Sequence, residues 1–242
     1  MTAAIVPAGQ LSMVICRTPE ELAHAARFRH ELFRSRSNLS FDENAERRRD
    51  EDAILVNLVL RDGIPVSTAR CVPYPSHTSP LTGVIDSRTY GADSEVGRIA
   101  AVAAPESAVY ALLALTLGAL WVLENSDRKT YISYVHPKLV AAYLPVGAVD
   151  TGTDCEIPNR SVVYRIVVGA YEDCVQRGLD LLGFTESQAR AVIGRQSAPS
   201  GSAQPHCPRI IQHRTRRPHH VADDRPPNPQ RRVCDPSPIH RH

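Results

Sequence analysis

Glu95 and Arg98 stand three positions apart in an otherwise apolar segment, EVGRIAAVA, that has the character of a buried strand. A carboxylate in such a place can take a proton from a reacting group and so act as a general base. The same two residues can equally form an ion pair at the end of a strand. Cys71 follows Arg70 in another predicted strand and is a weaker candidate for a nucleophile.

The sequence lacks the residue patterns that several other kinds of site require. The six cysteines include no Cys-x-x-Cys pair, and they indicate scattered free thiols rather than a disulfide framework or a zinc site. His24, His30, His77 and His136 have no mutual spacing that suits a metal site or a catalytic triad. The sequence also has no nucleophile elbow and no phosphate-binding P-loop. We therefore expect no metal and no tightly bound cofactor.

The charge of the chain is unevenly distributed. The 242 residues have a formal net charge of +2, but residues 197–242 hold 9 of the 19 prolines and 6 of the 10 histidines and carry +5. Residues 1–196 carry −3 and have the apolar content of a folded domain. We expect one domain over residues 1–196 and a disordered tail over residues 197–242 that neither fold nor activity needs. The tail has no aromatic residues for stacking on bases, so no nucleic-acid partner is predicted.

No segment indicates export or a membrane span. The N-terminus lacks a basic stretch followed by an apolar one. The longest apolar run, at 108–123, has 16 residues, whereas a bilayer requires about 20. We expect a cytoplasmic protein.

Apolar periodicity and turn residues predict the order of the elements. A strand at 13–17 precedes a helix with Thr18 as its N-cap and Pro19 as its first residue. The highly charged segment 35–52 is expected to be a loop or a frayed helix. The other predicted elements are a hairpin with strands at 53–60 and 64–72, a strand at 95–103, a helix at 105–125, a strand at 131–135, a short helix at 136–143, a strand at 162–168 and helices at 171–183 and 185–193. This order predicts an α/β fold with a mixed sheet and helices on both faces.

Three segments within this order resemble the GNAT acyltransferases. DGIPVSTARCVP (62–73) is similar to a strand pair of the family, and SEVGRIAAV (94–102) is similar to its central strand. YVHPKLVAAYLPVGAV (134–149) is similar to a later motif in which a tyrosine lies four residues before a glycine, as Tyr143 and Gly147 do here. The resemblance covers residues 14–168 and implies a GNAT-like central sheet.

Within the family, the sequence is most similar to the autoinducer-synthase-like branch, which includes acyl-homoserine-lactone synthases and long-chain N-acyl amino acid synthases. Members of this branch have, in order, Arg-x-x-x-Phe, acidic residues, an arginine that ends a hairpin, and Glu-x-x-Arg on the central strand. The matching residues are Arg29, Phe33, Asp50, Asp52, Arg70, Glu95 and Arg98. The tryptophan of the lactone synthases is absent, and Leu39 stands near its position.

The resemblance implies transfer of an acyl group from the thioester of an acyl-carrier protein or of coenzyme A to the amine of an amino acid or a related small metabolite. It implies Glu95 as the base, directly or through water, and Tyr143 as the proton donor to the leaving thiolate. The residues implied to bind or orient the acceptor are Arg29, Phe33, Asp52, Arg70 and Arg98. A structural ion-pair network is the alternative for the arginines, above all for Arg70.

The donor is implied to bind at the end of the central strand. Backbone amides near Val102, Ala103 and Ala104 would meet the thioester carbonyl, and Ser107 marks the N-terminus of the following helix. The segment AAPESAVYALL lacks the glycines of the usual GNAT pyrophosphate loop. Their absence favours a donor without the adenosine-diphosphate end, such as an acyl-carrier protein. Two alternatives stay open, an acetyl-coenzyme-A-dependent acetyltransferase of small amines and a thioester-binding protein without turnover.

Overall fold

A single mixed sheet organises the protein in the computed structural model, which describes residues 10–37, 42–158 and 162–194. The strands are β1 (Leu11–Ile15), β2 (Leu55–Arg61), β3 (Ile64–Pro73), β4 (Ser94–Ala101), β5 (Thr130–Val135), β6 (Val149–Glu156) and β7 (Val163–Ala170). They lie in the order β1-β2-β3-β4-β5-β7-β6. Among these seven described strands, β4 and β5 are the one pair that runs parallel. The tail predicted over residues 197–242 lies outside the described residues.

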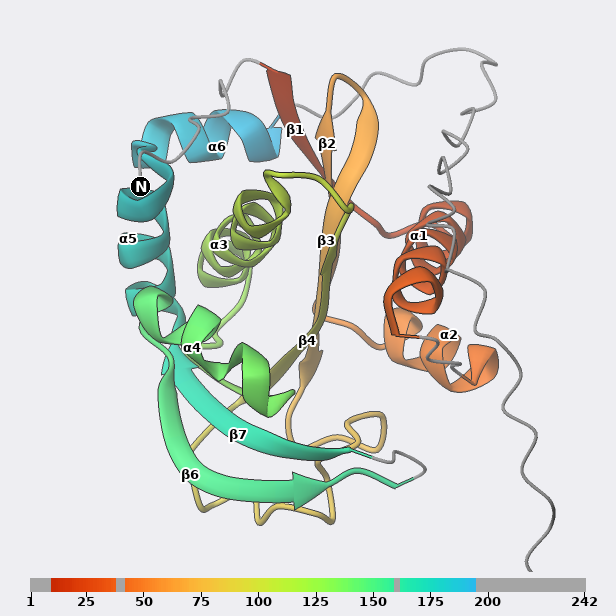
Figure 1. Cartoon of the computed structure of the whole chain (residues 1–242), viewed down its shortest axis with the longest axis vertical. Helices are drawn as coiled ribbons and strands as arrows, with labels where there is room; N and C mark the ends of the chain where they lie inside the picture. Colours follow the sequence, from red (N-terminus) through yellow and green to blue (C-terminus); the bar gives the residue numbers. More distant parts are fainter. Residues whose placement is uncertain (1–9, 38–41, 159–161, 195–242) are drawn as a thin grey trace, which may run out of the picture. The chain divides into compact units, whose positions relative to one another are not determined.

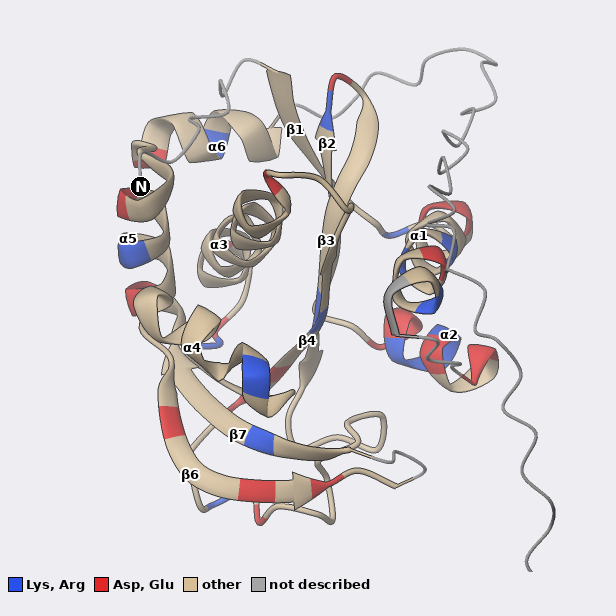
Figure 2. Ribbon diagram, viewed as in Figure 1, with Lys and Arg blue, Asp and Glu red and all other residues tan. Residues whose placement is uncertain are grey.

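Helices cover both faces of the sheet, as predicted. They are α1 (Pro19–Ser37), α2 (Glu43–Glu51), α3 (Ser107–Asn125), α4 (Val140–Tyr143), α5 (Tyr171–Leu182) and α6 (Glu186–Gly194), with the short 3-10 helices η2 (Pro137–Leu139) and η3 (Leu144–Val146) around α4. Figure 1 shows α1 and α2 on one face and α3, α5 and α6 on the other. Charged residues are frequent along α1 and α2, whereas α3 is almost uncharged (Figure 2).

Five of the seven residues of β2 are apolar, the exceptions being Asn57 and Arg61, because the strand is covered on both sides. Leu58 packs with α1 in one cluster, and Val59 packs with α3 in the main core. The turn to β3 is made by Asp62 and Gly63, which have φ values of 52° and 79°. This two-residue turn with positive φ at both positions confirms the predicted Asp-Gly hairpin.

The predicted start of α1 is also confirmed. Thr18 Oγ1 accepts the N–H of Glu21 at 3.2 Å, and the Glu21 carboxylate accepts the N–H groups of Arg17 and Thr18. This reciprocal capping sets the direction in which α1 crosses the sheet.

One element was not predicted and another was left open. The sequence does not predict the strand β6, because VDTGTDCE contains residues that are rare in strands and lies at an exposed edge of the sheet. Of the two alternatives for the charged segment, a loop or a frayed helix, residues 43–51 form a helix, α2, which Asp42 caps by accepting the N–H of Ala45. This helix forms despite its polar sequence because its inward-facing side chains pair with charged side chains from the sheet, as described for the candidate site.

Among the described helices, α3 is the one that is long and apolar enough to span a membrane by length and hydropathy. More than half of it, 56%, is buried within the protein. Leu113, Leu117 and Leu120 are almost inaccessible to solvent and belong to the main core. The apolar sequence of α3 is therefore explained by its burial in the main core.

The sheet splits at its centre. β4 and β5 pair only at Ser94 with Tyr131 and at Glu95 with Ile132. Beyond these pairs β4 stays with β3, while β5 stays with β7. In Figure 1, β6 and β7 turn away from β1–β4 accordingly. The parting of β4 from β5 begins directly after Glu95.

We expect Gly178→Ala to destabilise the protein by about 1–3 kcal/mol, because α3 and α5 touch at this glycine. A Cβ atom at Gly178 would lie 2.1 Å from Thr116 Oγ1 and 3.0 Å from Thr116 Cβ, so a rotation of the threonine side chain cannot relieve the contact. Urea denaturation measures the change. Gly194→Ala is the matched control, because nothing lies within 4 Å of a Cβ at this position. Equal stability of the two variants would contradict the prediction.

Candidate functional site

Five charged residues connect α1, α2 and the two central strands, and all are buried except Arg98, which is partly buried. Arg29 on α1 forms an ion pair with Asp50 on α2. Arg70 on β3 contacts Asp50 at 2.9 Å and Glu46 at 3.0 Å. Arg98 on β4 binds Glu46 through two nitrogen atoms, at 2.6 and 3.0 Å. No side chain of this set is more than 11% exposed, and we call it the buried ion cluster.

Glu46 is the centre of the buried ion cluster. It lies one helical turn before Asp50, so both carboxylates lie on the face of α2 that meets the sheet. Burial alone would raise the pKa of Glu46, but the hydrogen bond from Arg98 and the charges of Arg70, Arg98 and Arg49 hold it well below its usual range. Glu46 is therefore charged at every pH at which the protein is handled.

Arg98 reaches the cluster because β4 contains a bulge. Between the pairs Arg70–Gly97 and Thr68–Ala100, β4 has one residue more than β3. Arg98 has a φ of 56°, in the left-handed region. In a regular strand, residues three apart point to opposite faces. The bulge cancels this alternation, so Arg98 lies on the same face as Glu95 instead of entering the core beneath α3.

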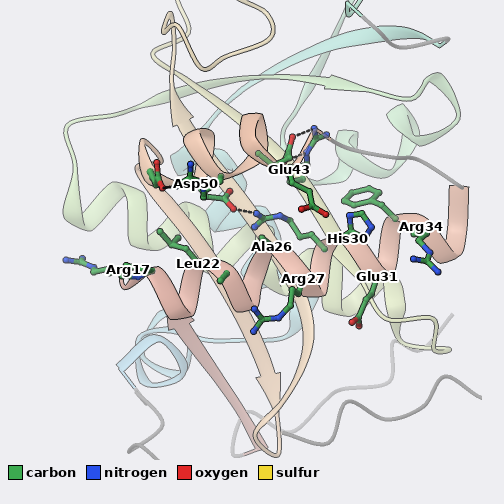
Figure 3. Close-up of a pocket in the computed structure, with 17 residues that line it drawn as sticks. Arg17, Leu22, Ala26, Arg27, His30, Glu31, Arg34, Glu43 and Asp50 are labelled. Atoms are coloured by element: carbon green, nitrogen blue, oxygen red, sulfur yellow. Dashed lines mark hydrogen bonds and ion pairs between the residues drawn. The ribbon is translucent and has the colours of Figure 1, made fainter. Parts of the chain in front are cut away.

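A cavity of about 700 Å³ opens between α1 and α2, and the buried ion cluster forms part of its wall (Figure 3). Leu22, Ala26 and Phe33 supply apolar surface from α1. Nη1 of Arg29 is buried and has no hydrogen-bond partner among the residues that the structure describes. The cavity thus combines apolar walls with one unused guanidinium donor.

Glu95 lies on β4 at the last residue that pairs with β5. It is 3% exposed and accepts a hydrogen bond from the Ser79 hydroxyl on Oε2. Burial raises the pKa of Glu95, and the Ser79 hydrogen bond and the charges of Arg70, Arg98 and Arg49 oppose this change only in part. Glu95 does not line the cavity, whereas Arg98 on the same strand does.

Metal binding finds no support in the described ranges, where no group of three or more His, Cys, Asp or Glu side chains could hold an ion.

Comparison with solved structures identifies the fold that carries these residues. The N-acyl amino acid synthase FeeM, from uncultured soil microbes, matches with a TM-score of 0.57 at 16% identity, over 69% of this chain and 93% of FeeM. The coenzyme-A-dependent acyl-homoserine lactone synthase BjaI matches with a TM-score of 0.53 at 13% identity, over 75% of this chain and 98% of BjaI. The chain has the GNAT fold. No family model and no curated protein matches the sequence itself.

In this GNAT fold, the predicted donor residues follow β4 as it leaves β5. The N–H of Val102 donates to the carbonyl of Val66 at 2.9 Å, so this amide is already used within the structure. Ala103 is exposed and Ala104 is half-buried. The N–H of Ser107 donates to the Ala104 carbonyl at 3.0 Å as α3 begins. Ala103 and Ala104 are therefore better placed than Val102 to offer an amide to a thioester.

Tyr143 lies on the other arm of the split sheet. Its ring packs against Val135 of β5 and Val167 of β7. Burial raises the pKa of Tyr143 to about 12, so its hydroxyl keeps its proton at neutral pH. Gly147, four residues later, has a φ of 87°, and a Cβ there would lie 2.8 Å from Cβ of Asp173 on α5. The Tyr-x-x-x-Gly spacing thus reflects a tight turn that sets Tyr143 beside β5.

The structure brings Arg29, Phe33, Arg70 and Arg98 to the cavity or its buried wall, but not Asp52. Asp52 is the C-cap of α2, its side chain is 45% exposed, and it faces His77 at 3.4 Å. Positions 50 and 52 cannot share a helix face, because neighbouring side chains on a helix are three or four residues apart. The second carboxylate is Glu46, which the Glu-x-x-x-Asp spacing would have identified if residues 43–51 had been predicted as a helix.

Proposed function

We propose that the protein is an N-acyltransferase that moves an acyl group from a thioester to the amine of an amino acid or a related small metabolite. The observation that carries the proposal is the unpartnered, buried Nη1 of Arg29 at the wall of the cavity, beside the strand that bears Glu95. The likeness in fold to an N-acyl amino acid synthase supports the same class of reaction.

The charges around the cavity favour an acceptor with a carboxylate. The buried ion cluster has three arginines, Arg29, Arg70 and Arg98, but only two carboxylates, Glu46 and Asp50. Each arginine contacts a carboxylate, but the three positive charges outnumber the two negative ones, so an anionic group of the ligand would balance the excess. A carboxylate fits the planar guanidinium of Arg29, and the apolar surface of α1 receives the rest of the acceptor.

The reaction then proceeds by direct attack. Glu95 takes a proton from the acceptor amine, directly or through water, and the amine nitrogen bonds to the thioester carbonyl carbon. The amides of Ala103 and Ala104 stabilise the negative oxygen of the tetrahedral intermediate. The carbon–sulfur bond breaks, and the leaving thiolate is protonated with the proton that Glu95 took from the amine.

Tyr143 acts in this scheme as a hydrogen-bond donor to the thiolate. Its pKa of about 12 lies above the ordinary value of a thiol, about 8.5. Complete proton transfer from Tyr143 to the thiolate is therefore uphill, whereas a hydrogen bond to it is favourable.

We further propose an acyl-carrier protein as the preferred donor. Glu106 occupies the N-cap of α3 without making a side-chain capping bond. Its negative charge and the absence of glycine in this segment disfavour the pyrophosphate of coenzyme A at the helix N-terminus.

We also propose a cytoplasmic location. The thiols of Cys16, Cys71, Cys155 and Cys174 are free and buried, which supports a reducing compartment.

The test uses the full chain with a panel of acyl-carrier-protein and acyl-coenzyme-A donors against amino acids and the corresponding amines. Thiol release and mass spectrometry of the N-acyl product measure transfer. The proposal predicts transfer to amino acids, with acyl-carrier protein as the better donor. Saturation by acetyl-coenzyme A at micromolar concentrations with a small amine would instead favour an acetyltransferase, and binding without transfer to any amine would refute the proposal.

Arg29→Lys is expected to raise the KM for the amino acid by about tenfold to a hundredfold with little change in kcat. A lysine at this position has one nitrogen atom, which Asp50 would hold, so it has no second nitrogen atom to place against the acceptor carboxylate as Nη1 of Arg29 is placed. Steady-state kinetics measure the split between KM and kcat. The amine without the carboxylate is the control substrate, and an equal loss with both substrates would contradict the role of Arg29.

A further inference from the structure

We propose that Ser79 is a positioning residue for Glu95: its hydroxyl holds one oxygen of the carboxylate, favours the ionised form and leaves the other oxygen to accept the proton. The catalytic part of this inference rests on the proposed function. The part that concerns the ionisation of Glu95 stands on the contacts of Ser79 alone.

The direction of the hydrogen bond follows from the contacts of the Ser79 hydroxyl. Its Oγ accepts the N–H of Leu81 at 3.2 Å, which leaves its single hydrogen for Oε2 of Glu95. Ser79 is 5% exposed and Glu95 is 3% exposed, so water does not compete strongly with this contact. A donor to a buried carboxylate stabilises the charged form of that group.

The segment that carries Ser79 is held to the wall of the cavity. The N–H of Ser79 donates to the carbonyl and to Oγ of Ser76, both at 3.2 Å. Arg49 on α2 donates its Nε–H to the carbonyl of Thr78 at 2.8 Å and pairs with Glu46 at 3.0 Å. The position of Ser79 is thus set by the same helix that lines the acceptor cavity.

The second oxygen of Glu95 faces the opening of the sheet. Oε1 lies 3.8 Å from the position that a Cβ atom would take at Gly97, the residue before the bulged Arg98. At this point β4 has already parted from β5. Ser79 therefore engages Oε2 on one side and leaves Oε1 on the side where the thioester and amine must meet.

The surroundings of Glu95 make the Ser79 hydrogen bond important for the ionisation of this carboxyl group. Burial raises the pKa of Glu95, and the Ser79 hydrogen bond is the first of the interactions that oppose it, before the charges of the arginines. The charged groups that face Glu95 are Arg49 from α2, Arg70 from β3 and Arg98 from β4. The titratable groups around it are Cys71, Tyr74, Tyr134 and Cys155. None of these four side chains donates a hydrogen bond to Glu95 in the described contacts, whereas Ser79 does.

Titration of the Glu95 carboxyl tests the inference without reference to activity. The full chain is labelled with ¹³C-glutamate, and Glu95→Gln identifies the Glu95 signal. Ser79→Ala is expected to move the midpoint of the Glu95 titration up by about one pH unit. Ser79→Cys, which keeps the size of the side chain but donates weakly, is expected to move it in the same direction and serves if the alanine variant does not fold. Ser79→Thr retains a hydroxyl and is expected to restore the wild-type midpoint.

Ser87→Ala, in the same connection between β3 and β4, is the matched control and is expected to leave the midpoint unchanged. An unchanged midpoint in both Ser79→Ala and Ser79→Cys would overturn the inference. The acid limb of kcat/KM is expected to move with the midpoint. If the midpoint moves and the acid limb does not, Ser79 still governs Glu95, and the assignment of Glu95 as the base in the proposed function is what fails.

Discussion

Glu95→Gln is expected to lower kcat for acyl transfer by about 10²–10⁴-fold. The amide of glutamine has nearly the shape of the carboxylate and can still accept the hydrogen bond of Ser79 through its oxygen, but it cannot take a proton from the amine. Single-turnover transfer from a saturating donor measures the loss. Glu156→Gln, at an exposed position on the edge strand β6, is the control and should keep full activity.

The pH dependence of the wild-type protein follows from the raised pKa of Glu95. Glu95 is the active base only when ionised, so kcat/KM should rise with pH along an acid limb that lies above the ordinary range of a glutamate. The contribution of Glu95 to folding stability should change in the opposite direction and fall as the pH rises. A group whose pKa is raised by folding favours the folded state below its unfolded pKa, and this contribution is lost as the pH rises through the folded pKa. Glu95→Gln should therefore be more stable than wild type at neutral pH but not in acid. Full activity in Glu95→Gln would remove Glu95 from the mechanism.

Glu46→Gln is expected to cost about 3–5 kcal/mol of stability, a large part of the total for a domain of ordinary stability. The variant removes the negative charge from Arg49, Arg70 and Arg98, which all contact Glu46. Urea denaturation at neutral pH measures the difference. The control is Asp52→Asn on the same helix, where the side chain is 45% exposed and a change within about 0.5 kcal/mol is expected.

The same variant has a defined pH dependence. The pKa of Glu46 is held well below its usual range, so the stability it contributes is present above the unfolded pKa of about 4.3 and is lost as the pH falls towards the folded value. The gap between wild type and Glu46→Gln should therefore narrow in acid. Similar losses in Glu46→Gln and Asp52→Asn at neutral pH would show that the buried ion cluster does not stabilise the fold.

Most of the elements could be predicted from the sequence because their signals are local. The Asp62-Gly63 turn, the Thr18 cap of α1 and the apolar run of α3 each depend on neighbours in the chain. The sequence did not predict β6 and left α2 open between a loop and a frayed helix, because both polar sequences lack the apolar periodicity of a buried element. The helix α2 is stabilised by arginines of the sheet that are distant in sequence, whereas β6 is stabilised by pairing with β7, the next strand in the chain.

In the candidate site too, the sequence determined some features and the tertiary structure decided others. The sequence by itself determined the residue types: a glutamate and an arginine on the central strand, and arginines on α1 and β3, in the order typical of the autoinducer-synthase-like branch of the GNAT family. The tertiary structure alone decided which carboxylate completes the cluster, Glu46 and not Asp52, because helical phase places one inward and the other outward. It also decided that Glu95 and Arg98 share a face and that Ser79 reaches Glu95. A bulge in β4 and the folding back of the β3–β4 connection depend on pairing between strands, which spacing along one strand cannot specify.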